Sequence, residues 1–552
     1  MIYTLLIGGA AGQGIDTTSA LLEWQLKKAG YAVLTSRDFM SRIRGGHNFI
    51  LLRFGDEVIE SADMALDGLI VLNEESLRLH RDSLKPDGFI LCDTDIESDD
   101  PRTIQLPMAD MAKELGNPRV AGSIANGVIL KLFGLDLDYS EVVLRQQVKD
   151  QYIEINQTAM REGYDAVEQR YDRLNADFAG HMLVSGNQAV ALGALAAGLR
   201  FYSAYPMSPS TGIMEYLAGQ SKNCDLVVEQ AEDEIAAINM ALGASFAGVP
   251  AMTGTSGGGF ALMVEALGLA GIAELPIVIA DVQRPGPATG LPTRTEQSDL
   301  KFVISAAQGE FPRMVIALRD QADAYEQTIR AFKIAERYQI PVILLSDQYL
   351  GDGTKSVPPF VIPDDEPVKT TEVETPYLRY RLTEDGVSPR LHPGQTGHLV
   401  TSDSDEHDEQ GMITESADMR NLMMEKRMGK LDHLRTELLE PEFTGDDACD
   451  VLLLAWGSTA GPVRRAVSEL NQGDGSRYGA LLFGDVFPLP VQELMKRAPR
   501  AKTVINVEQN YTGQLAGLVR ESCGIACDRS VLKYDGRQIT AAELIQKLSE
   551  EA

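Results

Sequence analysis

The sequence predicts an α/β protein made of three domains, each built around a parallel sheet. An apolar run, a glycine turn and a helical stretch follow one another in three separate parts of the chain. The apolar runs are short, β-branched and continuous, which is typical of strands buried on both faces of a parallel sheet. A chain of 552 residues is also too long for one hydrophobic core.

We expect the domains at residues 1–178, 179–355 and 447–552, with a segment rich in proline and acidic residues at 356–446. A segment this long is either an ordered excursion over the surface or a linker. In the first domain, strands are expected at 3–7, 49–54, 68–72 and 88–92, and a charged helical segment at 140–175. The first apolar run lacks a basic leader and reaches glycines at once, so it indicates a strand and not a signal peptide.

The second domain should begin with a helix at 189–199, followed by strands at 200–204, 225–228, 251–253, 277–281 and 341–346. In the third, strands are expected at 451–455, 478–482 and 503–507, with a helix at 461–470.

The amino-acid composition excludes several classes of function. With 44% apolar and 24% charged residues the chain resembles soluble globular proteins. No apolar run reaches the roughly 18 residues of a membrane helix, so we expect a cytoplasmic protein. The net charge of -30 disfavours nucleic acid. Five scattered cysteines without a C-x-x-C pair, and seven histidines without a ligand pair, predict neither an iron–sulfur cluster nor a zinc site, and we expect no metal.

The first motif is the glycine-rich loop at residues 8–14, between a strand and a helix. Glycines there let the backbone approach a phosphate at a helix N-terminus, although a tight turn packed on its own helix explains them as well. The spacing is not that of a dinucleotide site, since Thr17 stands where a third glycine is needed. Arg42 and Arg44, beside a glycine pair, suit an anionic ligand or simply a solvated surface.

Three further motifs each follow an expected strand. In the segment 205–211, two prolines fix the backbone around Ser208, and Ser210 or Thr211 is placed to cap the next helix. The segment 229–235 puts four acids before an alanine-rich helix. The helix dipole accounts for most of them, while one, Glu232 or Glu234, could hydrogen-bond a ring nitrogen of a ligand. The loop 253–259 combines hydroxyls with three glycines and permits close backbone approach.

The last motif is the stretch 281–299, dense in glycine, proline, threonine and arginine. Ordering such a loop is costly, which favours a binding role. Arg284, at the end of the strand, can offer its planar guanidinium to a carboxylate. All these loops follow the carboxyl ends of strands, where open α/β sheets bind ligands.

Together, the motifs from Tyr205, Glu229, Gly254 and Gln283 resemble the pyrimidine-binding domain of thiamine-diphosphate-dependent 2-oxoacid:ferredoxin oxidoreductases. Residues 1–178 resemble the gamma (acceptor) domain of that family, and 447–552 its transketolase-C-like domain. The fused arrangement and the acidic stretch 405–409 resemble the two-subunit, 2-oxoglutarate type.

The resemblance implies an alpha subunit that oxidatively decarboxylates a 2-oxoacid, 2-oxoglutarate above all, with coenzyme A to acyl-CoA, carbon dioxide and reduced ferredoxin. The reaction is reversible, as in the reductive tricarboxylic acid cycle. Glu234 is implied as the catalytic residue, bonded to the aminopyrimidine of thiamine diphosphate. Substrate contacts are implied for Arg284 and for Ser208, a position at which the family commonly has threonine. Arg294 is a candidate for the second carboxylate of 2-oxoglutarate, or it simply faces solvent. Cofactor contacts are implied for Tyr205, Pro206, Thr255, Ser256 and Gly257, and, toward coenzyme A, for Gly9, Gly12, Gly14 and Arg44. Ala11 replaces a common glycine of the family and leaves coenzyme A binding open.

The resemblance also implies a beta subunit in an (αβ)2 assembly. Neither Gly-Asp-Gly triplet, at 351–353 or 473–475, is followed by asparagine in the family's pattern. Magnesium and the diphosphate half of the site, a 4Fe–4S cluster and the ferredoxin dock are therefore expected on the partner. Pyruvate and branched-chain 2-oxoacids remain alternative substrates. A scaffolding subunit with a decayed thiamine site is the alternative from another class, and a nucleotide-linked dehydrogenase is disfavoured by the glycine spacing.

Overall fold

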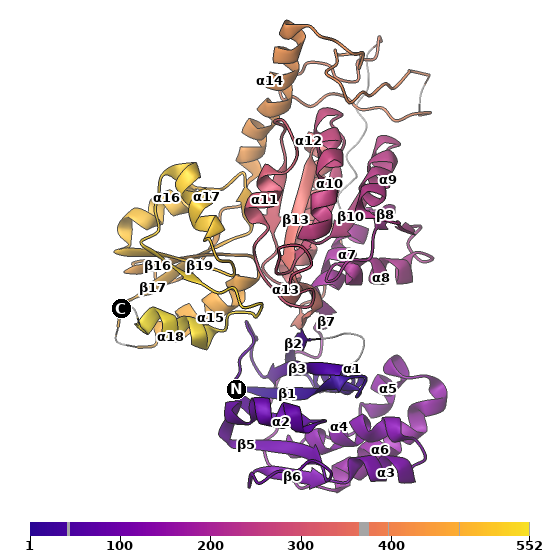
Figure 1. The fold of residues 1–552 in the computed structure, drawn as a ribbon, viewed down its shortest axis with the longest axis vertical. Coiled ribbons are helices and arrows are strands. Elements are labelled where there is room, and N and C mark those ends of the chain that lie inside the picture. The colour runs from indigo at the N-terminus through magenta and orange to yellow at the C-terminus, as the bar shows by residue number, and fades with distance from the viewer. Residues whose placement is uncertain (41–44, 364–374, 396, 474, 551–552) are drawn as a thin grey trace. The chain divides into compact units, whose positions relative to one another are not determined.

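The structure, a computed structural model, describes residues 1–40, 45–363, 375–395, 397–473 and 475–550, which form three sheets (Figure 1). They divide into two compact units. Unit 1 holds Met1–Val184, Gly353–Pro359 and Thr540–Ala542, and unit 2 holds the remaining described residues. The α/β fold class expected from the sequence is confirmed. The domain limits expected within the chain stay a prediction.

The sheet of unit 1 has the strand order β6-β5-β4-β1-β3-β2-β14-β7. The pairs β1–β4, β4–β5 and β5–β6 are parallel, whereas β1–β3, β2–β3 and β2–β14 are antiparallel. The strand β2 was not expected from the sequence. It is followed directly by β3, which is possible because strands of an antiparallel pair need no crossover helix between them. The strands are β1 (Ile2–Ala11), β2 (Ala32–Phe39), β3 (Gly45–Gly55), β4 (Leu66–Val71), β5 (Leu84–Asp93), β6 (Thr103–Leu106), β7 (Met182–Ser185) and β14 (Thr354–Val357).

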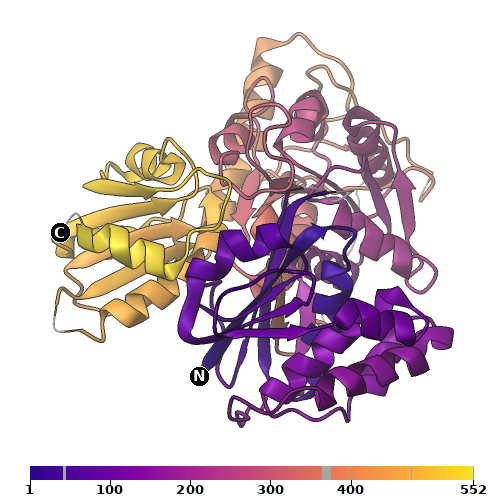
Figure 2. The ribbon, with the colours of Figure 1, turned by 60° about the horizontal axis from the view of Figure 1, so that its bottom comes forward.

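Six helices accompany this sheet: α1 (Ile15–Lys28), α2 (Glu74–His80), α3 (Met108–Glu114), α4 (Ala121–Leu132), α5 (Ser140–Gln147) and α6 (Ile153–Asp165). Figure 2 shows the purple helices gathered beside the indigo strands. The backbones of α4 and α6 are in close contact at Gly127. A Cβ on this glycine would lie only 1.9 Å from the carbonyl oxygen of Met160, so no larger residue fits there unless the helices shift. The helical segment expected to reach residue 175 ends at Asp165. Beyond it the chain packs on the C-terminal end of α4, where the Arg170 and Tyr171 amides donate to the Leu132 carbonyl.

The larger sheet of unit 2 has the order β18-β12-β13-β11-β10-β8-β9, and α10 and α12 run beside β13 (Figure 1). Its pairs are parallel except β12–β18. Every residue of β10 to β13 is buried, as the continuous apolar runs predict. Its strands are β8 (Phe201–Ala204), β9 (Val227–Gln230), β10 (Ala251–Thr255), β11 (Ile277–Gln283), β12 (Met314–Ala317), β13 (Pro341–Asp347) and β18 (Asp485–Phe487).

The strand expected at 225–228 begins two residues later, at Val227, because Asp225 has a positive φ of 49° that ends the preceding turn. The helices of this part are α7 (Gly186–Ala196), α8 (Thr211–Gln220), α9 (Glu234–Phe246), α10 (Gly257–Ile272), α11 (Leu300–Ser305), α12 (Gln321–Tyr338) and α13 (Gln348–Asp352).

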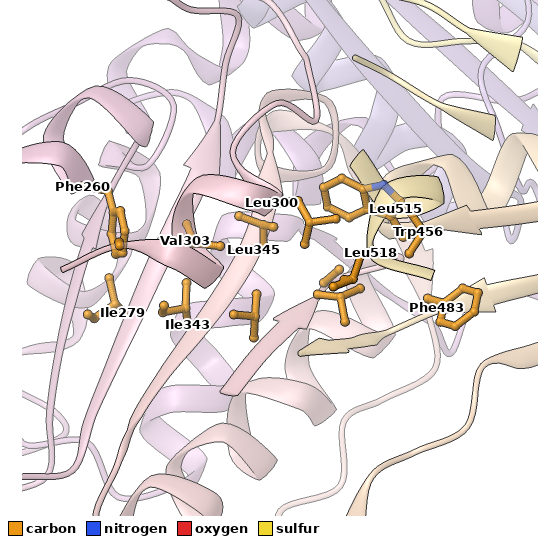
Figure 3. Packing of buried hydrophobic residues seen from close by; sticks show 14 of the residues in the cluster. Phe260, Ile279, Leu300, Val303, Ile343, Leu345, Trp456, Phe483, Leu515 and Leu518 are labelled. Carbon is orange, nitrogen blue, oxygen red and sulfur yellow. The ribbon is translucent and has the colours of Figure 1, made fainter. Parts of the chain in front are cut away.

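The third sheet, also in unit 2, has the order β15-β17-β16-β19-β20, parallel except for β15–β17. It shares one hydrophobic core with the larger sheet. In Figure 3, Ile343 and Leu345 of β13 continue through Leu300 to Leu515 and Trp456. Its elements are β15 (Glu442–Gly445), β16 (Val451–Trp456), α15 (Ala460–Leu470), β17 (Tyr478–Phe483), α16 (Gln492–Arg497), β19 (Thr503–Glu508), α17 (Gln514–Cys523), β20 (Arg529–Leu532) and α18 (Ala541–Glu550).

The described part of the proline-rich and acidic segment includes one long helix, α14 (Ala417–Leu434). Lys426 and Lys430 of α14 both donate to the carboxylate of Glu274, which follows α10, and all three side chains are 1% exposed. Burial alone would raise the pKa of Glu274, but the charges of Lys430 and Lys426 hold it well below its ordinary range. This triad fastens α14 to the larger sheet's layer of helices. No helix among the described residues is both long and apolar enough to cross a bilayer.

Candidate active site

A buried glutamate opens α9. The Asp233 carboxylate accepts a hydrogen bond of 2.7 Å from the Ala236 amide, which makes Asp233 the N-cap and Glu234 the first helical residue. Glu234 is 3% exposed, and its Oε1 has no hydrogen-bond partner among the described residues. Glu232, the other candidate, is exposed. A buried acceptor without a donor is costly, so Glu234 is the carboxylate prepared to receive one from a ligand.

The loop after β10 reaches this carboxylate. A Cβ on Gly259 would lie 2.6 Å from Glu234 Oε1 and 2.1 Å from Thr255 Oγ1, so only glycine lets α10 begin here. The Thr255 hydroxyl lies 3.8 Å from the Met207 sulfur. Ser256 is fully buried, and its Oγ has no partner in the described part of the chain. The loop thus joins Glu234 to the segment that follows β8.

That segment is held from β11. Arg284 Nη1 donates a hydrogen bond of 2.7 Å to the carbonyl oxygen of Ser208. Tyr205 is 40% exposed and Pro206 is half-buried at the same turn. Burial lowers the pKa of Arg284, while the charges of Asp299 and Glu234 act in the opposite direction. Arg284 therefore lies within electrostatic reach of the buried glutamate.

The structure places two of the predicted residues, Ser210 and Arg294, in contacts that differ from their expected roles. Ser210 stands at the N-cap position of α8, but its hydroxyl donates to the Met207 carbonyl at 2.8 Å and does not cap the helix. The expected side-chain cap is wrong, because the backbone of Ser210 is itself helical, with φ -74° and ψ -14°, and not extended as at a capping residue. Arg294 packs against Gly536, where a Cβ would lie 3.1 Å from the Arg294 Cβ. The contacts that join Ser208, Arg284 and Glu234 in the described structure do not include Arg294.

The glycine loop of unit 1 is a second candidate site. Gly12 and Gly14 have positive φ angles of 94° and 86°, and Gly14 precedes α1. A Cβ on either glycine would meet no described atom within 4 Å, so the backbone there faces open space. Gln13 fixes the turn, since its Oε1 accepts from the Ala10 amide at 2.7 Å and its Nε2 donates to the Leu72 carbonyl at 3.0 Å. Gly9 lies beneath this side chain. Arg42 and Arg44 lie outside the described residues.

Within the described ranges, no group of three or more histidine, cysteine, aspartate or glutamate side chains is placed to hold a metal ion. The five cysteines, Cys92, Cys224, Cys449, Cys523 and Cys527, are free thiols.

Two protein-family models match the chain. The model described as "Pyruvate ferredoxin/flavodoxin oxidoreductase" covers residues 4–166, and that described as "Pyruvate flavodoxin/ferredoxin oxidoreductase, thiamine diP-bdg" covers residues 192–426. The second model contains Ser208, Glu234, Gly259 and Arg284.

Full-length relatives extend this match. The "2-oxoacid:ferredoxin oxidoreductase subunit alpha" of Sulfolobus sp is 33% identical, over 99% of this chain and 96% of that protein. The chain belongs to the family of 2-oxoacid:ferredoxin oxidoreductase alpha subunits. The "2-oxoglutarate oxidoreductase subunit KorA" of Mycobacterium tuberculosis is 30% identical, over 96% of this chain and 83% of that protein. A solved 2-oxoglutarate:ferredoxin oxidoreductase of Magnetococcus marinus, with 2-oxoglutarate, coenzyme A and succinyl-CoA bound, superposes with a TM-score of 0.92. It is 32% identical, and the match covers 100% of this chain and 99% of that one.

The alpha subunit is thus part of an oxidoreductase. The larger sheet of unit 2, apart from β18, lies in the region matched by the thiamine-diphosphate-binding model of the family. The residues present fit that cofactor. The orphaned Glu234 Oε1 suits a protonated ring nitrogen, and Gly259 leaves the space beside it without a side chain.

Two further acids lie close to this alpha-subunit site: Asp281 pairs in register with Thr255, and the charge of Asp299 acts on Arg284. The sequence predicts a binding loop over 281–299 and indicates no separate role for either acid. An aspartate inside a mainly apolar buried strand was the available signal for Asp281. For Asp299 there was none, because the path of the loop cannot be read from its composition.

Proposed function

We propose that this alpha subunit acts on 2-oxoglutarate, with Glu234 as the catalytic residue and Arg284 as the ligand of a substrate carboxylate. The observation that carries the proposal is the buried Glu234 Oε1 without a partner among the described residues, next to Gly259. The KorA relative and the Magnetococcus marinus structure, both named for 2-oxoglutarate, support this substrate.

Glu234 accepts a hydrogen bond from the ring nitrogen of the aminopyrimidine and so holds a proton at that atom. Thiamine diphosphate, when bound, supplies the nucleophilic carbon and the electron sink of the reaction. Thr255 and Ser256 contribute hydroxyls, and Gly257 brings the backbone close. Because Glu234 is buried, its hydrogen bond is formed away from water, where it is stronger than at the surface.

Arg284 binds the substrate carboxylate through nitrogen atoms other than the Nη1 that holds the Ser208 carbonyl. That bond fixes the guanidinium and directs the turn at Tyr205 and Pro206 toward the site. The Ser208 side chain faces the same substrate group in this proposal, and Arg294 is the candidate for a second carboxylate.

In unit 1, the loop with Gly9, Gly12 and Gly14 receives coenzyme A through backbone amides, with Arg44 as a counter-charge. A beta subunit supplies the diphosphate and magnesium half of the site, the 4Fe–4S cluster and the ferredoxin dock, in an (αβ)2 assembly. The net charge of -30 supports a ferredoxin dock on the partner, since ferredoxins are usually acidic.

The test is the purified alpha–beta complex, assayed with 2-oxoglutarate, pyruvate and branched-chain 2-oxoacids for coenzyme-A-dependent dye reduction. We expect 2-oxoglutarate to give the highest kcat/KM. Glu234→Gln should lower kcat by about 10²-fold or more, whereas Glu232→Gln, at the exposed acid two residues earlier, should leave it unchanged.

Preference for pyruvate, after which both family models are named, would replace the substrate and keep the site. Full turnover by the Glu234→Gln complex would refute the assigned role and favour a scaffolding subunit.

A further inference from the structure

Two aspartates of the stretch 281–299, Asp281 and Asp299, have no part in the proposed function. Asp281, in β11, is fully buried, and neither of its carboxylate oxygens has a hydrogen-bond partner among the described residues. Asp299, just before α11, has one oxygen, Oδ2, that is buried and likewise unpartnered in the described part of the chain. Carboxylate oxygens are strong acceptors, and three of them without donors in one place require an explanation.

The fold holds the pair at the edge of the sheet where the site lies. Asp281 pairs in register with Thr255 of β10. The Asp299 carboxylate rests on Gly257, where a Cβ would lie 2.4 Å from Oδ2 and 2.6 Å from Oδ1. The Asp299 amide donates a 3.0 Å hydrogen bond to Gln283 Oε1. Since residues i and i+2 of a strand share a face, Gln283 anchors Asp299 on the side to which Asp281 points.

The charges around the pair come from several elements. Burial and then the negative charge of Asp299 raise the pKa of Asp281 well above its usual range. Burial raises the pKa of Asp299 to about 6, and the positive charge of Arg284 limits that rise. Glu296, whose pKa is raised to about 7 by burial and then by Asp299, is the third carboxyl nearby. The charge of Glu234, on α9, also acts on Arg284.

Two further charged groups on neighbouring elements point elsewhere. On α11, Lys301 Nζ would lie 2.8 Å from a Cβ on Gly517 of α17. On β13, Asp347 accepts a hydrogen bond from the Leu350 amide at 3.0 Å. Arg284 is therefore the cation whose charge acts on Asp299, and it holds the pKa of Asp299 lower than burial alone would.

We infer that Asp281 and Asp299 hold one proton between them in the free protein, and that Asp299 takes up a second from solvent when a 2-oxoacid carboxylate binds Arg284. The inference rests on the proposed function, since it needs Arg284 to bind substrate. The bound carboxylate brings a second negative charge to the same guanidinium, and two carboxylates that share one cation favour protonation of one of them. Asp299 is thus a positioning residue that makes substrate binding pH-dependent.

The direction in which substrate affinity changes with pH follows from the linkage between proton uptake and substrate binding. Binding that takes up a proton weakens as pH rises through the pKa of the group that accepts it, by at most about tenfold per pH unit for one proton. We therefore expect the Kd for a 2-oxoacid to rise by several-fold between pH 7 and pH 8, in the range where free Asp299 is ionised.

The experiment is calorimetric titration of the thiamine-loaded alpha–beta complex with N-oxalylglycine, in which an amide nitrogen replaces the methylene beside the keto carbon of 2-oxoglutarate. Titrations at pH 7 in two buffers of different ionisation enthalpy give the number of protons taken up. We expect about one proton for the native complex. Asp299→Asn, which keeps the shape without the charge, should take up none and show a pH-independent Kd. Glu296→Gln, the matched control in the same loop, should keep the uptake.

Assays with the panel of 2-oxoacids distinguish failure of this inference from failure of the proposed function. An active complex that takes up no proton, or an Asp299→Asn complex with native uptake, overturns this inference and leaves the proposed function intact. A complex that turns over no 2-oxoacid overturns both. If Asp299→Asn does not assemble, Asp281→Asn serves instead: it keeps one titratable carboxyl beside Arg284 and should shift the pH range of the uptake.

Discussion

Replacing Gly259 by alanine should damage the active site more than the fold. The new Cβ would lie 2.6 Å from Glu234 Oε1 and 2.1 Å from Thr255 Oγ1, where an ordinary contact begins at 3.4 Å. Glu234 would have to retreat by about 0.8 Å. Misplacement of a reacting group by about 1 Å costs roughly 10²-fold in rate, equivalent to about 2.7 kcal/mol of barrier.

The neighbouring glycine provides the matched control. A Cβ on Gly258 would meet only the Ala288 carbonyl oxygen, at an ordinary 3.7 Å. Both substitutions lie in the first turn of α10 and bring a similar helix-propensity gain of at most about 1 kcal/mol. We expect kcat/KM, measured with saturating thiamine diphosphate, to fall about 10²-fold for Gly259→Ala and less than about twofold for Gly258→Ala. Equal activities of the two variants, with equal melting temperatures, would refute the assignment of Glu234.

The other predictions concern stability. Glu274→Gln leaves two buried lysines without their carboxylate and should destabilise unit 2 by about 3–5 kcal/mol in denaturant titrations. Since those lysines hold the pKa of Glu274 below its ordinary 4.5, the native protein should lose this stabilisation as pH falls below 4.5, and the variant should lack that acid dependence. Gly127→Ala places a Cβ 1.9 Å from the Met160 carbonyl oxygen and should destabilise unit 1 by about 1–3 kcal/mol. Glu508→Gln removes an acceptor that receives hydrogen bonds from two asparagine side chains, an indole and two amides, and should cost about 1–3 kcal/mol.

Two variants serve as controls for these measurements. Glu425→Gln changes an exposed acid of α14 and should leave stability unaltered. Gly219→Ala fills a helical position with no atom within 4 Å and should be neutral or stabilising. If Glu274→Gln or Gly127→Ala behaves like its control, the corresponding packing argument is wrong. For Glu508→Gln, unchanged hydrogen-exchange protection of the Leu515 amide, 2.8 Å from Glu508 Oε1, would be the contradictory result.

Sequence reasoning succeeded where one physical pattern decides the structure. Continuous, mainly apolar runs such as 277–281 and 341–346 favour strands inside a sheet, and both became buried strands. It was less reliable where local patterns were mixed. β2 carries Ser-Arg-Asp just before its last residue, Phe39, and was missed, although its antiparallel neighbour was found.

The active site, too, could be predicted from the sequence only in part. Loops after strand ends were expected to gather at one edge of a sheet, and Arg284 and Ser208 do make contact there. The choice between Glu232 and Glu234 could not be made from sequence, because a helix dipole favours acids throughout the first turn. Burial, which depends on the close approach of Gly259, separates the two. The proximity of Asp299 to Gly257 depends on how the long loop after β11 folds back, and no local pattern encodes that path.

The short strand β18 has a consequence for how this chain can be divided. It lies late in the sequence, between β17 and α16, yet it pairs with β12 and so covers a border of the seven-stranded sheet. A fragment that stops before Asp485 would leave the backbone groups of β12 bare, and bare sheet borders recruit strands from other molecules. Attempts to produce the thiamine-binding part separately should therefore yield aggregates, and those that keep the chain through Phe487 and its supporting sheet should stay in solution.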